Sequence, residues 1–113
     1  MLQDAHSRKI SDPIDAAVGD TVLIARNPDE WHYIHEIIGD LSTAGTVSVI
    51  AIDSDTTEHI LATFTLADGQ GLTLQDEPGE DNRPRFEFNP DQNAVMRVSA
   101  GSFIGGLHWS KRL

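Results

Sequence analysis

The feature that most constrains the fold of this chain is a series of turn signals that divides its 113 residues into short segments. Clusters of Gly, Pro, Asn, Asp and Ser recur at a spacing of roughly eight to twelve residues, which is typical of all-β sandwiches and barrels. The segments between them are rich in Val, Ile, Thr and Phe, which suit a pleated, half-buried surface. The clusters lie at residues 27–30, 42–45, 53–56, 67–71, 76–84, 89–93 and 100–102.

Apolar side chains alternate with polar ones inside these segments. In residues 60–66 the even-numbered side chains are apolar, and residues 94–100 and 103–109 show the same period of two. This period places one face of a strand in the core. Ile50 and Ile52 have the opposite parity to the core positions of their segment, which indicates a strand covered on both sides. The predicted core consists of Val47, Val49, Phe64, Leu66, Phe86, Phe88, Val98, Phe103 and Leu107.

We therefore expect an all-β, antiparallel sandwich of about eight short strands in a single domain at residues 18–113. Residues 1–17 lack sustained alternation and are predicted to form an N-terminal arm. Residues 31–38 are ambiguous, because Pro28 and a capping box ending at Glu30 are also compatible with a helix. The aromatic and β-branched side chains of that segment favour a strand.

Composition excludes several classes of protein. The net charge is 8 − 18 = −10, which argues against binding to a phosphate backbone. The absence of cysteine excludes disulfide scaffolds, Cys-ligated zinc and thiol catalysis. No apolar run approaches the roughly 20 residues that span a bilayer, and the first residues do not resemble a signal peptide. We therefore expect neither nucleic acid nor membrane as a partner.

Charge is uneven along the chain. Residues 1–81 carry 3 − 16 = −13 and residues 82–113 carry 5 − 2 = +3. One interpretation is a basic edge that meets an acidic surface of a neighbouring subunit. The alternative, which we favour, is that the strands intermix these charges when they fold.

Candidate metal sites are weak. His32, His35 and Glu36 match no zincin order, and two histidines three residues apart on a strand point to opposite faces. Residues 53–58 resemble a calcium loop but place Glu58 where an EF-hand needs glycine. The acidic residues 76–82 suit a solvated hairpin loop, with Ca²⁺ binding as the alternative. We predict no metal and no cofactor.

Catalytic patterns are equally sparse. There is no Gly-x-Ser-x-Gly elbow, and sequence spacing cannot test Glu36 and Glu87 as a glycosidase pair. Gly105-Gly106 lies between apolar strand residues, which indicates close backbone approach or a bulge rather than a phosphate loop. We therefore predict that the protein is not an enzyme.

The aromatic residues have two possible roles. Trp31, Tyr33 and Trp109 would form a sugar-stacking platform if they were exposed on one face, but the core or a subunit interface is the favoured interpretation. The residues predicted to form an interface are Trp31, Tyr33, Ile50, Ile52 and Trp109.

From about Asp15 onward, the chain resembles small β proteins of phage and prophage structural modules. The resemblance rests on the order of the segments 15–25, 31–38, 44–49, 60–70, 93–101 and 103–107, ending in an Ala-rich strand and a strand with Gly105-Gly106. It implies a β-sandwich of jelly-roll type, assembled as a homo-oligomer, often a trimer, on the virion. The resemblance implies no catalytic residues.

The resulting expectation is a non-enzymatic virion structural protein that decorates a capsid or forms a tail or fibre accessory. Its partners would be copies of itself and other virion proteins, and it would occur on the virion and, during assembly, in the host cytoplasm. Two alternatives stay open. One is a carbohydrate-binding module, and the other is a small metal-binding barrel that uses His32, His35, His59 and Glu36.

Overall fold

The computed structural model describes residues 9–76 and 83–112, and these residues form seven β-strands. No helix long and apolar enough to cross a membrane occurs among them. Residues 31–41 form a strand, as their composition predicted. The strands are β1 (Lys9–Ile24), β2 (Trp31–Leu41), β3 (Gly45–Asp53), β4 (Glu58–Leu66), β5 (Gly71–Leu74), β6 (Phe86–Phe88) and β7 (Gln92–Arg112).

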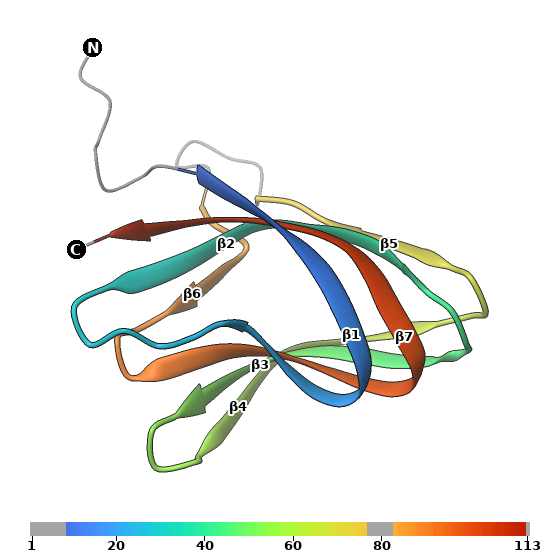
Figure 1. Cartoon of the computed structure of the whole chain (residues 1–113), viewed down its shortest axis with the longest axis horizontal. Coiled ribbons are helices and arrows are strands. Elements are labelled where there is room, and N and C mark those ends of the chain that lie inside the picture. The colour runs from blue at the N-terminus through green and yellow to red at the C-terminus, as the bar shows by residue number, and fades with distance from the viewer. Residues whose placement is uncertain (1–8, 77–82, 113) are drawn as a thin grey trace.

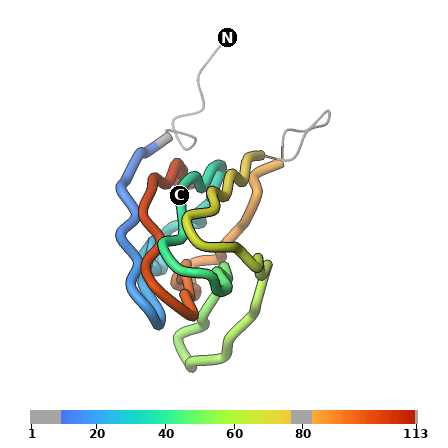
Figure 2. The backbone as a smooth tube through the Cα atoms, turned by 90° about the vertical axis from the view of Figure 1, so that its right-hand side faces the viewer, coloured from blue at the N-terminus to red at the C-terminus, as the bar shows by residue number. Residues whose placement is uncertain are grey.

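All seven strands belong to one antiparallel sheet with the central order β4-β3-β7-β2-β5. The first part of β7 pairs with β3, its second part pairs with β2, and β1 follows β7 through both parts. The sheet therefore has a β3/β4 half and a β2/β5 half (which includes β6), and the two halves share β1 and β7. It curls like half a barrel, so that the two halves face each other (Figures 1 and 2).

Two glycines allow the shared strands to bend. Gly19 in β1 has φ = 101° and Gly101 in β7 has φ = 67°, both in the left-handed region that favours glycine. The turn signal at residues 100–102 is thus a bend inside one 21-residue strand rather than a turn between two strands. This bend explains why seven strands form where the sequence predicted about eight.

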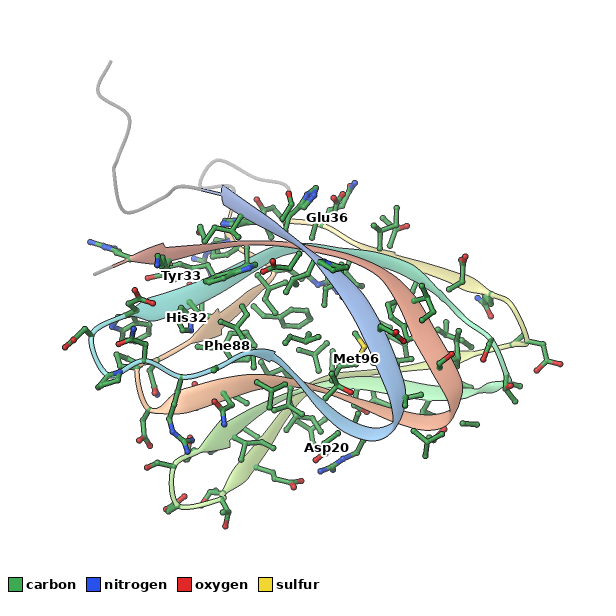
Figure 3. The ribbon with its side chains drawn as sticks, viewed as in Figure 1. Asp20, His32, Tyr33, Glu36, Phe88 and Met96 are labelled. Atoms are coloured by element: carbon green, nitrogen blue, oxygen red, sulfur yellow. The ribbon has the colours of Figure 1, made fainter. Side chains whose placement is uncertain are left out.

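The core lies between the two halves of the sheet. Phe88 from β6 and Met96 from β7 both point into this space, and neither is accessible to solvent (Figure 3). Eight of the nine predicted core residues are buried, and the ninth, Phe64, is partly buried against the same cluster. The period of two therefore identified the core-facing side chains correctly.

The strand β1 begins earlier than the predicted domain boundary. Residues 9–17 pair with β7, from Lys9 opposite Ser110 to Ala17 opposite Ser102, and do not form an arm. Pro13 and the two acidic residues Asp12 and Asp15 obscure the strand character of this segment in the sequence. An edge strand tolerates proline, because one side of its backbone needs no partner. Residues 1–8 of the predicted arm lie outside the described residues.

Two β-bulges change which side chains share a face. A register shift between β3 and β4 places Ile60 opposite Ile50, and Ala62 opposite Val49. Ile60 is therefore on the outer face, although simple alternation predicted that it would share a face with Phe64. A second shift, between Ile34 and Glu36 of β2, has the same effect in the other half.

Gly105 permits the close backbone approach that the sequence predicted. A methyl group on Gly105 would collide with the carbonyl of Ile38 and with the Cα of Gly39, the residue paired with it. A methyl group on Gly39 would lie 2.7 Å from the ring of Phe103. The two glycines thus leave the space in which Phe103 packs.

Candidate functional site

A row of apolar side chains crosses the outer face of the β3/β4 half. Val22, Val95, Ile50 and Ile60 are register partners on four adjacent strands. Ile50 and Val95 are buried in the middle of the row but do not belong to the core cluster. At its ends, Val22 and Ile60 are 53% and 61% exposed. We call these four residues the outer row.

An ion-pair cluster lies beside the outer row. Nε and Nη2 of Arg97 donate to Asp20 at 2.6 and 3.0 Å, and Nη1 and Nη2 donate to Glu58 at 3.0 and 2.8 Å. These hydrogen bonds lower the pKa values of both carboxyl groups and raise the pKa of Arg97. Asp20 lies at the outer surface of this half (Figure 3). Strands from both ends of the sequence meet here, so the charges intermix as favoured above.

A shallow pocket of about 290 Å³ lies on the β2/β5 half, lined by His35, Glu36, Gln75, Asp76 and His108. The bulge in β2 places both His35 and Glu36 opposite His108 of β7. Nδ1 of His108 lies 3.0 Å from Oε1 of Glu36, and Gln75 donates to Oε2 of the same carboxylate at 3.2 Å. Every lining side chain is polar, in contrast to the outer row.

His35 links Asp76 to Ser110 in a hydrogen-bonded chain. Its Nδ1 lies 2.9 Å from Oδ1 of Asp76, and its Nε2 lies 2.7 Å from Oγ of Ser110. A carboxylate can only accept from Nδ1, and in the neutral tautomer that carries its proton on Nδ1 the Nε2 atom accepts from the Ser110 hydroxyl. This is the order of groups in a Ser-His-Asp triad, but Ser110 is only 2% exposed and does not line the pocket. The chain can orient His35 but offers substrate no open hydroxyl.

The histidines proposed for a metal site do not come together. His32 points inward, its Nε2 donates to Oε1 of Glu30 at 3.1 Å, and its ring contacts Trp109 edge-on. His59 lies on β4 beside Asp53. Opposite orientations of His32 and His35 were predicted from their spacing. No group of three or more His, Asp or Glu side chains suited to a metal occurs within residues 9–76 and 83–112.

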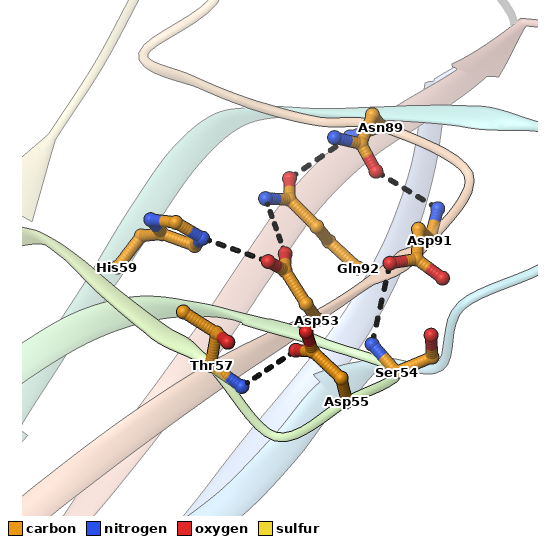
Figure 4. A network of polar contacts seen from close by, with 8 residues as sticks. All are labelled: Asp53, Ser54, Asp55, Thr57, His59, Asn89, Asp91 and Gln92. Carbon is orange, nitrogen blue, oxygen red and sulfur yellow. Dashed lines mark hydrogen bonds and ion pairs between the residues drawn. The ribbon is translucent and has the colours of Figure 1, made fainter.

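The candidate calcium loop at residues 53–58 is a hydrogen-bonded turn. Asp53 accepts from Gln92 at 3.0 Å and contacts Nε2 of His59 at 2.9 Å, which lowers its pKa (Figure 4). Asp55 accepts from the backbone of Thr57. These carboxylates therefore join the β3–β4 turn to the start of β7. The acidic loop 77–82 lies outside the described residues.

The five predicted interface residues lie in different environments. Ile50 is fully buried within the chain, Trp31 is 43% exposed, and Tyr33 and Ile52 are half-buried. Trp109 is half-buried and donates to Asp12 at 2.8 Å. Trp31 is opposite Arg112 in the register, three positions from Trp109, so the two tryptophans belong to opposite faces and form no common platform.

Sequence reasoning missed Val22 and Ile60 as surface residues and Ser110 and Asp76 as partners of His35. The bulges were the obstacle, because a single extra residue exchanges the two faces of a strand. Alternation gave no signal for Val22, because the buried Ile14, Ala16 and Ile24 of β1 have the same parity and the register with β7 shifts on both sides of it. Nothing in the spacing of Asp76 and Ser110 connects either residue to His35.

Comparisons with known proteins assign the chain to no family. No protein-family model and no curated protein match the chain. A Bacillus endospore appendage, from a family described as disulfide-linked pili, is 15% identical, with a TM-score of 0.47 over 99% of this chain and 95% of that one. The crystal structure of PirA is 10% identical, with a TM-score of 0.39 over 98% of this chain and 97% of that one. At this level neither likeness carries an argument about function.

The expectation of a phage or prophage virion protein is wrong. The two similar solved structures are described as an endospore appendage and as PirA, and neither description names a capsid, tail or fibre. The predicted location on the virion is therefore wrong as well, and the predicted virion partners are not supported. The resemblance rested on strand order and turn vocabulary, which unrelated β proteins share because the same backbone geometry demands them.

Proposed function

We propose that this protein is a non-enzymatic structural subunit that associates with further copies of itself through the β3/β4 half of its sheet. The observation that carries the proposal is the outer row, which ends in two highly exposed apolar side chains on regular strands. Exposed apolar surface on regular strands is typical of a protein–protein contact. All seven large hydrophobic residues that are exposed in the described part of the chain lie in strands rather than loops: Val18, Val22, Trp31, Ile38, Ile60, Leu61 and Ile104.

Association between copies cannot use disulfide bonds, because the chain has no cysteine. The disulfide linkage named for the Bacillus appendage family is therefore not available here. A net charge of −10 opposes contact between copies, and salt screens that repulsion. Self-association should increase with ionic strength.

We also propose that the curled sheet is a two-layer sandwich of jelly-roll type. In support, β1 and β7 each contribute to both halves, and the core lies between the halves.

Light scattering over a range of protein and salt concentrations tests the function. We expect masses above 12.4 kDa that increase with both concentrations. Replacing Val22 and Ile60 together by Lys should shift the protein to monomer, because it places charge at both ends of the outer row. A monomer under every condition would contradict the proposal.

The non-enzymatic part has its own test. A fluorophosphonate probe labels serine nucleophiles activated by histidine, and Ser110 is the only serine here hydrogen-bonded to a histidine among the described residues. Because its hydroxyl is buried, we expect no labelling. Labelling that is lost in Ser110→Ala would show that the chain at His35 is catalytic.

A further inference from the structure

The strand β4 has a free edge. Among the described strands it pairs only with β3, and its other side borders a groove of about 430 Å³. Leu61 and Ala62 of β4 line one wall of the groove, and residues 85–87, at β6, line the other. The backbone N–H and C=O groups on this side of β4 therefore have no strand partner within residues 9–76 and 83–112. An unpaired edge of this kind is a template for another strand.

The other long free edge, β1, is protected against pairing. It carries Asp12 and Asp15, which would repel a second copy, and Pro13, which lacks a backbone N–H. In contrast, β4 contains no Lys, Arg or Pro. Its single acidic residue, Glu58, stands at the first position and is already paired with Arg97.

An antiparallel pair of β4 strands avoids repulsion between their carboxylates. A twofold axis near the middle of β4 places the two Glu58 side chains at opposite ends of the pair. With a rise of about 3.4 Å per residue, they would then be separated by more than 20 Å. The regular stretch Ala62–Leu66, which follows the bulge, supplies the pairing length. Leu61, which is exposed in the single chain, would lie at the border of this paired stretch, where the second copy would cover it.

We infer that β4 pairs antiparallel with β4 of a second copy of this chain and so extends the β3/β4 half into a continuous sheet across a twofold axis. This inference rests on the proposed function, since it specifies where the copies meet. It also makes the outer rows of two copies continuous through their Ile60 ends, and leaves each Val22 far from the contact.

The cysteine-free chain allows a direct test by crosslinking. Single cysteines are introduced at Leu61, Ala62, Thr63 and Thr65, with Val22→Cys and Ile104→Cys as exposed controls outside β4. Two copies of one residue come within the 4.4–6.8 Å Cα separation of a disulfide only close to the twofold axis. Mild oxidation should therefore give a covalent dimer that peaks at one β4 position, at least about tenfold above both controls. Equal crosslinking at β4 and the controls would overturn the inference.

Charge substitutions separate edge pairing from stacking of the outer rows. Leu61→Lys should raise the dimer dissociation constant by about tenfold or more, because a desolvated lysine opposes strand addition. Ile38→Lys and Ile104→Lys, which are exposed and lie outside the outer row, should leave it unchanged. If Val22→Lys weakens association as strongly, or if Leu61→Lys has no effect, the edge inference fails while self-association stands. A wild-type protein that is monomeric throughout would refute both.

Discussion

The two halves of the sheet enclose one core but differ in their outer surfaces. The β3/β4 half presents the outer row, and the nearby carboxylates Asp20 and Glu58 are both paired with Arg97. The β2/β5 half presents the pocket at His35, in which imidazole and carboxylate groups pair with each other. Polar groups that satisfy one another can face water without a partner, whereas exposed apolar strands gain free energy when a partner covers them. This difference is the reason for proposing the β3/β4 half as the side on which copies meet.

The largest expected effect concerns the backbone of the β2/β5 half. Gly105→Ala should lower the free energy of unfolding by about 3 kcal/mol, because the new methyl group collides with the backbone at Ile38. Gly106→Ala is the matched control, since the nearest atom to its methyl group would be 4.0 Å away. Urea denaturation measures both changes. Equal losses of unfolding free energy in the two variants would show that β2 and β7 do not approach as closely at Gly105 as described.

A smaller effect is expected from the chain of hydrogen bonds at His35. Ser110→Ala and Asp76→Asn should each cost about 1–2 kcal/mol of unfolding free energy, because each leaves a half-buried imidazole nitrogen poorly paired. His108→Ala, on the exposed side of the same pocket, should cost less. If His108→Ala lowers the free energy of unfolding as much, the stability of the pocket depends on its exposed side chains rather than on the hydrogen bonds of His35. Neither Ser110→Ala nor Asp76→Asn should change self-association, because both residues lie in the half that is not proposed to contact other copies.

The smallest effect concerns the Arg97 cluster on the β3/β4 half. The lowered pKa values of Asp20 and Glu58 mean that their stabilisation is present above the pKa of the unfolded chain, near 4, and is lost as pH falls through the folded pKa. Arg97→Met removes the cause, so stability should fall less between pH 4 and pH 2 than in the wild type. Stability at pH 7 should change little, because the pairs are exposed. Acid titration followed by circular dichroism measures this loss of stability, with Arg112→Met as the control variant. An acid transition of Arg97→Met identical to that of the wild type would contradict the prediction.

Several elements could be predicted from the sequence because they depend on local rules. Alternation identified Phe88, Phe103 and Leu107 as core residues, and β-branched composition identified residues 31–41 as a strand. These signals depend on a period of two, which each strand carries within itself. The close approach at Gly105 was also readable, because a glycine between apolar strand residues rarely has another role.

Other elements depend on partners distant in the chain. The bulge that moves Ile60 to the outer face exists only in the register of β3 with β4. Pairing with β7 alone shows that residues 9–17 are strand, because their acids and Pro13 give no alternation. The contacts of His35 join residues 41 and 75 positions away.

The sequence by itself determined that the chain forms antiparallel strands around one apolar core, since turn residues and alternation act over a few residues. Only the tertiary structure decided that one sheet bends through Gly19 and Gly101 into two halves, and which apolar side chains remain outside. Those outcomes depend on register, and a shift of one residue exchanges the faces of a strand without changing its sequence. The free edge of β4 is likewise a property of the curled sheet rather than of the strand.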